Sequence, residues 1–405
     1  MLAIISIAAW LLAVASSHPL LYPSRSCPSL GSGTIDIASY QLYPENADFD
    51  EQSCLLCFTT IANRDYHPSD LGALYNASVV VYDPYKKSVV ETIEFPNITR
   101  TVPFHIGGVA WDPYSSKKPN SKSEAKKPGD EITILVDAAP AHETAGRDIS
   151  GDNYILRWDA VSKRVLWTAN LTTVSRGRYG GPQDIEHDGR GNVFVLGTYP
   201  GTLVRVSAPP SNSKTGVIEE WYIPPPSPNT SVLDHAVIGF TGLAAYDSDT
   251  LLVADARNNS VQGGALYRFD MSAKKGTPVA IPITYPTTGS ADADVIRPGD
   301  AIYLPKRYAR EVLLISEHDK GVSVVRSRKK DEVWRSAEFL GRIANPANIT
   351  ASGGLVTAVV EIAGRVYLVE EWFTDAIVPG TSAGNRTTFP LVDVTAQLDA
   401  LVRGR

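Results

Sequence analysis

Short runs of alternating hydrophobic and polar residues, separated by turn residues, recur along this chain. Residues 179–206 (YGGPQDIEHDGRGNVFVLGTYPGTLVRV) show the pattern: a Gly-Gly-Pro turn, an alternating segment, a polar hairpin, and two further strand-like segments. Alternation with a period of two, bounded by Gly, Pro, Asn and Asp, predicts half-buried β-strands joined by hairpins. No long stretch has the 3.6-residue periodicity of an amphipathic helix. The pattern therefore predicts an all-β protein.

This unit recurs six times, in copies that begin near Leu42, Phe104, Tyr179, Val237, Arg297 and Pro346. The copies are roughly 45 to 75 residues apart, which is enough for a small sheet in each. Repeats of about 40 to 50 residues with four strands each are typical of a β-propeller, in which every repeat forms one blade. The sequence therefore predicts a six-bladed β-propeller that occupies residues 18–405 as a single domain.

The propeller geometry predicts which side chains meet at one end of the central channel. The innermost strand of each blade begins at that end, and the second strand returns to it. Polar and aromatic residues lie at the predicted starts of innermost strands: Glu45, Asn46, His105, Gln183, Asp184, Phe240, Thr241, Asp300 and Asn348. Similar residues lie at the predicted ends of second strands: Asp137, Thr198, Tyr199, Asp255, Arg257, Glu317, His318, Glu371 and Trp372. A polar ring with aromatic walls is typical of a small-molecule site.

A structural role is the alternative for each residue of this ring, because polar groups at blade ends often satisfy the backbone of neighbouring loops. Asp112, Asp188 and Asp247 follow the first strands of their repeats, and we interpret them as turn-forming residues. His67 and His142 lie in polar segments, which predicts that solvent surrounds both side chains.

The charge of the chain limits its partners. Lys and Arg total 38, Asp and Glu total 44, and the formal net charge of the 405 residues is −6. Nucleic acids and anionic membranes bind basic surfaces, so neither is expected as a partner. The lysine-rich segment 115–130 lacks interleaved aromatic residues, and we interpret it as a surface insertion.

The N-terminus resembles a secretory signal peptide. An apolar run from Leu2 to Val14 precedes the small residues Ala15 and Ser17, which suit cleavage before His18. The run is shorter than the ~20 residues that a membrane-spanning helix needs. We therefore expect residues 1–17 to be removed and the protein to be secreted or held in vesicles. Positive residues before the run are missing, so a retained anchor is the alternative.

Seven Asn-X-Ser/Thr sequons agree with a secretory route: Asn76, Asn97, Asn170, Asn229, Asn258, Asn348 and Asn385. An N-linked glycan is bulky and solvated, so these asparagines are expected on the surface.

Three cysteines, Cys27, Cys54 and Cys57, also bear on the compartment. In an oxidising environment two of them are expected to pair. Cys54 and Cys57 are three residues apart in a predicted strand, so their side chains would face opposite sides of the sheet. Cys27 is therefore expected to pair with Cys54 or Cys57 and to tie the N-terminal segment to the first blade.

The motifs of two hydrolase classes are missing or incomplete. The sequence has no Gly-x-Ser-x-Gly elbow, and no cysteine is paired with a histidine of the ring. Glu45 and residues 251–261 (LLVADARNNSV) resemble elements of gluconolactonase-type six-bladed propellers, which bind a divalent cation. After Gly-Gly-Pro, however, this chain has Gln183-Asp184-Ile185 where those enzymes have Pro-Asp-Gly or Pro-Asn-Gly. No metal site is therefore assigned, and a metal-dependent lactonase is kept as an alternative.

Five segments together resemble a family of secreted fungal propellers encoded in natural-product gene clusters. They are LYPENADFD, FHIGGVAWDP, YGGPQDIEHD, RPGDAI and VEEWFTD, and they span roughly Leu42 to Asp375. One branch of that family accompanies trichothecene biosynthesis, and another comprises the hetero-Diels–Alderases of tropolonic sesquiterpenoid pathways. The signal peptide and the dense sequons favour the Diels–Alderase branch.

This resemblance implies a ring-forming reaction without a cofactor. A tropolone o-quinone methide would add to an alkene of a humulene-type sesquiterpene, while the protein aligns both reactants and donates hydrogen bonds to the heterodiene oxygen. His105 and Gln183 are the candidate donors, and Glu45 or Asp184 would orient them or assist dehydration. The remaining candidates would contact the substrates, the aromatic ones as an apolar clamp: Asn46, Tyr179, Tyr199, Phe240, Thr241, Asp300 and Trp372.

Three other functions are left open by the sequence. The chain could be another ring-closing or accessory protein of a trichothecene-type sesquiterpene cluster, a metal-dependent lactonase, or a noncatalytic propeller that binds a ligand. A cation at Glu45 would favour the lactonase, and a narrow channel without aromatic walls would favour the binding protein.

Overall fold

The computed structural model describes residues 27–60, 77–99, 104–113, 130–226, 232–258, 265–286, 296–328, 333–381 and 383–404. The predicted signal peptide, His67, Asn76, Asn229 and most of the lysine-rich segment lie outside these residues.

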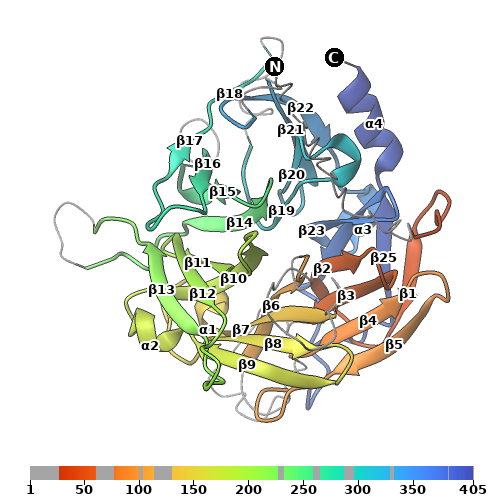
Figure 1. The fold of residues 1–405 in the computed structure, drawn as a ribbon. Coiled ribbons are helices and arrows are strands. Elements are labelled where there is room, and N and C mark those ends of the chain that lie inside the picture. Colours follow the sequence, from red (N-terminus) through yellow and green to blue (C-terminus); the bar gives the residue numbers. More distant parts are fainter. Residues whose placement is uncertain are drawn as a thin grey trace, which may run out of the picture.

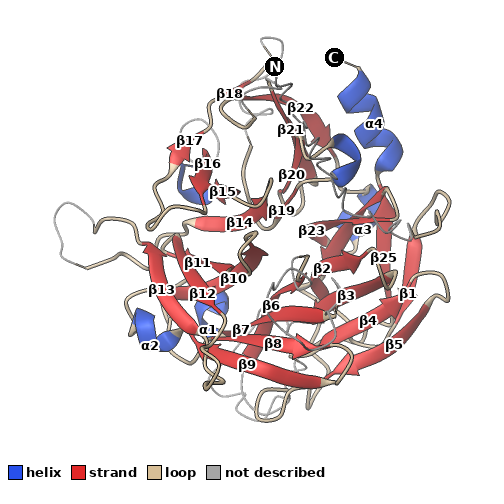
Figure 2. Cartoon of the chain, in the orientation of Figure 1, coloured by secondary structure: helices blue, strands red, loops and turns tan. Residues whose placement is uncertain are grey.

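Six sheets surround a central axis, which confirms the predicted six-bladed β-propeller (Figures 1 and 2). Blade 1 holds β2 (Pro44–Asp50), β3 (Leu55–Thr60), β4 (Val79–Asp83) and β5 (Ser88–Ile93). Blade 2 holds β6 (Phe104–Trp111), β7 (Glu131–Ala138), β8 (Tyr154–Asp159) and β9 (Arg164–Asn170). Blade 3 holds β10 (Gly180–His187), β11 (Val193–Tyr199), β12 (Thr202–Ser207) and β13 (Val217–Tyr222).

The second half of the chain forms the other three blades. Blade 4 holds β14 (Phe240–Ala245), β15 (Thr250–Asp255), β16 (Ala265–Asp270) and β17 (Val279–Ala280). Blade 5 holds β19 (Ile302–Tyr303), β20 (Val312–Ser316), β21 (Val322–Ser327), β22 (Ala337–Ile343) and the short β18 (Ile283–Thr284), which is parallel to β22. Blade 6 holds β23 (Leu355–Ile362), β24 (Arg365–Glu371), β25 (Thr388–Asp393) and β1 (Ile35–Ala38).

The two ends of the described chain close the ring together. β1 pairs with β25 in antiparallel register, with Ile35 opposite Leu391, so the N-terminal strand completes the last blade. Hydrophobic clusters fill the spaces between neighbouring blades, as where Phe194 and Trp221 of blade 3 pack with Phe240 and Phe269 of blade 4. This packing holds the innermost strands at fixed positions around the axis.

Cys27 forms a disulfide with Cys54, with a Cα–Cα distance of 5.6 Å, and Cys57 is a buried free thiol. This confirms that Cys27 is tied to blade 1 and selects one of the two predicted partners. Cys54 precedes β3 in a turn, with a φ of 58°, rather than lying inside the strand. The disulfide indicates an oxidising, secretory-type environment.

Helices are few and short in the described residues: α1 (Pro140–Glu143), α2 (Thr172–Ser175), α3 (Ala347–Ala351) and α4 (Thr395–Arg403), with 3-10 turns η2 (Ala256–Asn258) and η3 (Lys306–Tyr308). α4 buries Leu398 in the cluster between blades 5 and 6. None of these helices has the length and apolarity to cross a bilayer.

Candidate functional site

A β-bulge marks the start of the innermost strand in blades 1, 2, 3, 4 and 6. The strand register shifts between Pro44 and Ala47, His105 and Gly108, Pro182 and Asp184, Phe240 and Gly242, and Val356 and Ala358. A bulge re-aims the side chains around it. This recurrent feature explains why Asn46 and Gln183 interrupt apolar strands, because both residues belong to a bulge.

Hydrogen bonds across the axis join several residues of the predicted ring. The amide nitrogen of Gln183 donates to Asp300 Oδ1 at 2.8 Å, and Thr198 Oγ1 donates to Gln183 Oε1 at 2.7 Å. Asn46 Nδ2 donates to Asp184 Oδ1 at 3.3 Å. These contacts link blade 3 to blades 5 and 1, so the ring braces this end of the channel.

Two histidines in the ring share one buried carboxylate. Asp137 Oδ2 lies 3.7 Å from His105 Nδ1 and 3.5 Å from His142 Nε2, and His105 Nε2 lies 3.6 Å from Glu143 Oε1. Burial opposes the charged form of His105, but the Glu143 and Asp137 carboxylates outweigh it and raise the pKa of His105. Gly107 leaves room for Asp137, because a Cβ there would lie 3.0 Å from Asp137 Oδ1.

The predicted exposure of His142 is therefore wrong. Its side chain is 23% exposed, its Nε2 lies 3.3 Å from the carbonyl oxygen of Pro182, and its ring packs against Tyr199. Burial lowers the pKa of His142. The short helix α1 carries this histidine into the ring, and the polar composition of the segment gave no sign of that contact.

Two acidic side chains of the ring carry buried oxygens without a hydrogen bond in the described residues. Glu45 Oε2 and both carboxyl oxygens of Glu371 have no hydrogen-bond partner within the part of the chain that the structure describes. Burial, with the charges of Asp300 and Asp137, raises the pKa of Glu45 well above its usual range. Burial likewise raises the pKa of Glu371. Burial therefore favours the neutral form of both carboxyls.

The predicted aromatic wall is wrong. Phe240 is 0% exposed and Trp372 is 1% exposed, and each packs inside a hydrophobic cluster. Tyr179 points to the outer part of blade 3, where its hydroxyl donates to Glu220 Oε1 at 3.0 Å. Tyr199 is 6% exposed and packs against the His142 ring. These side chains pack in the hydrophobic core of the propeller, because aromatic side chains near blade ends fill the spaces between sheets.

Five further ring residues have other positions or partners. Asn348 is an exposed residue of α3 and does not join the ring contacts. Asp255 pairs with Arg257, and Glu317 pairs with Arg342, both at 2.6 Å. Thr241 is 3% exposed, and its hydroxyl has no hydrogen-bond partner within the described residues.

The three predicted turn-forming aspartates differ in their contacts. Asp188 accepts backbone N–H bonds from Arg190 and Asn192, and Asp247 accepts them from Asp249 and Thr250, which confirms both predictions. Asp112 forms a buried ion pair with Arg157. The turn that follows it lies outside the described residues, so its role as a turn former stays a prediction.

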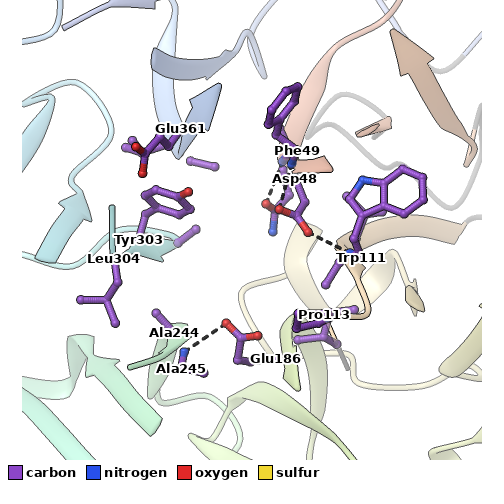
Figure 3. A pocket seen from close by; sticks show the side chains of 18 of the residues that line it. Asp48, Phe49, Trp111, Pro113, Glu186, Ala244, Ala245, Tyr303, Leu304 and Glu361 are labelled. Atoms are coloured by element: carbon purple, nitrogen blue, oxygen red, sulfur yellow. Dashed lines mark hydrogen bonds between the residues drawn. The ribbon is translucent and has the colours of Figure 1, made fainter. Parts of the chain in front are cut away.

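A cavity of about 390 Å³ lies in the channel below the ring, and the innermost strands of all six blades line it (Figure 3). Among the predicted ring residues, all of which the structure describes, only Asn46 and Asp184 line this cavity. Apolar side chains form about half of its wall: Phe49, Trp111, Ile185, Leu243, Ile302, Leu304 and Val359. Polar and charged side chains, among them Lys306 and Arg310, form the rest. The volume is in the range of about 300–1,000 Å³ that is usual for small-molecule pockets.

Buried carboxyls face this cavity. Asp48 accepts hydrogen bonds from the backbone N–H groups of Phe49 and Trp111 at 2.9 and 2.8 Å, and burial raises its pKa to about 7. Glu186 accepts from the backbone N–H of Ala245 at 3.0 Å, and burial raises its pKa too. Figure 3 shows Asp48 across the cavity from Glu361 and Tyr303, and Glu186 next to Ala245.

Asp184 connects the cavity to the ring. Its Oδ2 accepts from the backbone N–H of Leu243 at 3.2 Å, and its Oδ1 accepts from Ile185 at 2.9 Å and from Asn46. Burial raises the pKa of Asp184 to about 8. At neutral pH this group is therefore largely a carboxylic acid.

Asp48, Glu186, Tyr303 and Glu361 were missed by the sequence prediction. The alternation of the strands could have indicated two of them. Asp48 lies two residues after Asn46, and Glu186 lies two residues after Asp184. Alternate residues of a strand face the same side, so the channel-facing set continues down each innermost strand.

Within the described residues, no group of three or more His, Cys, Asp or Glu side chains is arranged so that it could hold a metal ion. Glu45, the residue that resembles the lactonase ligand, lies among carboxyls and contributes to no such group.

Comparison with known proteins gives the family. No family model matches the chain. The chain is 32% identical over 394 residues to "Trichothecene biosynthesis protein 14" of Trichoderma arundinaceum, covering 94% of this chain and 93% of that protein. It is 29% identical over 388 residues to "Core trichothecene cluster (CTC) protein 14" of Fusarium sporotrichioides, covering 93% and 88%.

A solved structure supports the fold alone. The major Malassezia sympodialis allergen Mala s 1 superimposes with a TM-score of 0.60 at 18% identity, covering 89% of this chain and 95% of the allergen. The relatives confirm a fungal secondary-metabolism propeller and lie in the trichothecene branch. The chain therefore belongs to the family of fungal trichothecene-cluster protein 14.

Proposed function

We propose that this chain is a ring-closing enzyme of trichothecene-type sesquiterpenoid metabolism and that the axial cavity is its active site. Two relatives carry the name of a trichothecene-cluster protein, which supports the substrate class. A cavity whose wall combines apolar side chains with carboxyls supports an oxygenated carbon skeleton as its occupant. The Cys27–Cys54 disulfide supports a reaction in the secretory pathway.

The observation that carries the proposal is the position of Asp48. Its carboxyl faces the cavity and accepts two backbone hydrogen bonds, and its pKa is raised to about 7 by burial. The charge of Glu186 adds to that rise. A carboxyl that is about half protonated at neutral pH is a suitable general acid, and a second carboxyl in the same cavity is a suitable base.

The proposed step is an intramolecular ether formation. Asp48 gives its proton to a hydroxyl or epoxide oxygen of the sesquiterpenoid as the carbon–oxygen bond of that group breaks. A second hydroxyl of the same molecule attacks the carbon, and its proton passes to Glu186. One carbon–oxygen bond forms as another breaks. The substrate undergoes no net oxidation or reduction, so the step needs no redox cofactor. Asp184 would position the substrate at the inner end of the cavity.

A hetero-Diels–Alder reaction is the second candidate, because a neutral carboxyl donor facing the cavity is also what a cofactor-free cycloaddition requires. Asp184, with its pKa of about 8, would donate to the heterodiene oxygen. His105 and Gln183 were the predicted donors, but their neighbours in the ring already engage them. This reaction needs a tropolone quinone methide and a humulene-type alkene in the cavity together.

The experiment compares product formation from different substrates. Purified protein is incubated with an oxygenated trichothecene-type sesquiterpenoid, with the tropolone and humulene pair, and with a simple lactone, and products are identified by mass spectrometry. We expect the first substrate to give a cyclic ether faster than in the protein-free control. Product from the second pair alone would favour the cycloaddition, and opening of the lactone would favour a hydrolase. Saturable binding without any product would favour a noncatalytic propeller.

A further inference from the structure

A second pocket, of about 380 Å³, lies on blade 6 between its outer strands and α3. Residues of β1 and β25 form one side, and α3 with its flanking residues forms the other. We call this space the blade 6 pocket. It shares no lining residue with the axial cavity, so its role is separate from the proposed reaction.

The chemistry of the blade 6 pocket suits a neutral, hydroxyl-rich ligand. Pro346, Pro390 and Val392 supply apolar surface. Asp36 and Thr388 are exposed, and their side chains form no hydrogen bond within the described residues. A carboxylate and a hydroxyl without partners can receive and donate hydrogen bonds to sugar hydroxyls, while aliphatic carbons pack on the proline rings.

The one arginine of the pocket is already neutralised. Arg386 forms two hydrogen bonds of 2.9 Å to the carboxylate of Asp375, and its guanidinium carbon lies 4.3 Å from the centre of the Trp372 ring. A bidentate pair of this kind leaves little net charge for an anionic ligand. The pocket therefore favours an uncharged occupant.

A sequon lies at the rim of this pocket. Asn348 is exposed, lines the pocket, and begins the sequence Asn348-Ile349-Thr350. We propose that the blade 6 pocket holds the first sugars of an N-linked glycan on Asn348, and that this contact stabilises the closure between β1 and β25. A glycan is tethered to the chain, so even weak contacts with the pocket would be populated.

Asn385 provides a matched control. It is exposed, begins the sequon Asn385-Arg386-Thr387, and precedes a residue of the pocket, but it does not itself line the pocket. A glycan on Asn385 has the same bulk and solubility without the proposed contacts. A difference between the two sites would thus report on the pocket rather than on glycosylation in general.

The test uses protein secreted from a eukaryotic host, with Asn348→Gln and Asn385→Gln variants. Glycopeptide mass spectrometry gives the occupancy of each site, and hydrogen exchange measures the protection of amides in β1 and β25. We expect a glycan on Asn348, faster exchange in both strands of Asn348→Gln, and a fall of about 1–2 °C in its melting temperature. Asn385→Gln should leave exchange in these strands unchanged.

A double variant tests whether the pocket transmits the effect. Asp36→Ala with Thr388→Val removes the two free polar groups and should leave the occupancy of Asn348 unchanged. In the double variant, removing the glycan should no longer alter the hydrogen exchange of the amides in β1 and β25. Trimming the glycan to a single N-acetylglucosamine should preserve the protection. An unmodified Asn348, or equal exchange with and without its glycan, would overturn the proposal.

Discussion

The carboxylate of Asp48 in blade 1 accepts a hydrogen bond of 2.8 Å from the backbone N–H of Trp111 in blade 2. Glu186 in blade 3 makes the same kind of contact with Ala245 in blade 4. The acidic groups that face the cavity therefore also bridge neighbouring blades, which fixes their positions before a substrate arrives. Fixed polar groups lower the cost of reorganisation during a reaction.

The first prediction concerns stability against pH. Burial raises the pKa values of Asp184 and Glu370 to about 8 and that of Asp48 to about 7, so the folded state binds more protons than the unfolded state above pH 4. Their stabilising contribution is complete below the unfolded pKa and is lost as the pH rises through the folded pKa. Denaturant midpoints should therefore be higher at pH 6.5 than at pH 8.

The comparison of stability is not extended below pH 6.5, because the pKa shifts of two histidines change stability with pH in the opposite direction. Burial lowers the pKa of His142, and it lowers that of His187 to about 4, so their contribution is lost on further acidification. Glu370→Gln is the matched control, because it removes one titration and should reduce the pH slope by up to about 1.4 kcal/mol per pH unit. A midpoint that rises from pH 6.5 to pH 8 would contradict the assignment of neutral buried carboxyls.

The second prediction separates bracing from catalysis in the polar ring. Gln183→Leu removes the hydrogen bond to Asp300 that crosses the channel and the hydrogen bond from Thr198 within blade 3. We expect a loss of about 1–3 kcal/mol in unfolding free energy, because a buried acceptor is left without its partner. Turnover per folded molecule should change much less. A stable variant with a large loss of turnover would instead make Gln183 part of the reaction.

The third prediction concerns the N-terminal tie. Cys27→Ser opens the loop closed by the disulfide, whose cysteines are 27 residues apart. The chain-entropy model predicts a loss of roughly 3 kcal/mol. Cys57→Ser changes a buried thiol without opening the loop and serves as the comparison. Equal unfolding midpoints for Cys27→Ser and the unmodified protein would show that the disulfide does not hold blade 1.

The recurrence of short alternating segments was sufficient to predict six blades, because each blade is a local unit of consecutive strands. It was not sufficient to predict how the ring closes. The pairing of Ile35 with Leu391 joins opposite ends of the chain, and a four-residue strand gives no local signal of that partner. The same limit applies to Asn46 and Asp184, which are 138 residues apart and meet only because the blades surround one axis.

The aromatic candidates show a different limit. Phe240 stands at a strand start, as predicted, but residue type and position do not reveal whether a ring points to the axis or into the space between blades. In the structure its ring stacks on Tyr222 within the hydrophobic cluster between blades 3 and 4. The polar candidates were located better, because a buried polar side chain in an apolar strand needs a partner, and the channel is where such partners meet.

The fourth prediction concerns chelation. The proposed ether formation moves protons between two carboxyls and the substrate, and no part of it requires a Lewis acid. Exhaustive treatment with a chelator should therefore leave the rate of product formation unchanged, while a metal-dependent lactonase treated in parallel should lose activity. A loss that added divalent cation restores would assign a metal-dependent reaction to this chain.

Turnover of the sesquiterpenoid substrate by Asp48→Asn tests the central claim most directly. The variant keeps the shape of the side chain but cannot donate a carboxylic proton, so product formation should fall by about 10²–10⁴-fold while substrate binding is retained. Thermal unfolding of the variant verifies that the blade 1 to blade 2 bridge is intact. Asp319→Asn removes a carboxyl whose side chain is 54% exposed and should retain full turnover. Unchanged turnover by a folded Asp48→Asn protein would contradict the assignment of the axial cavity as an acid-catalysed active site.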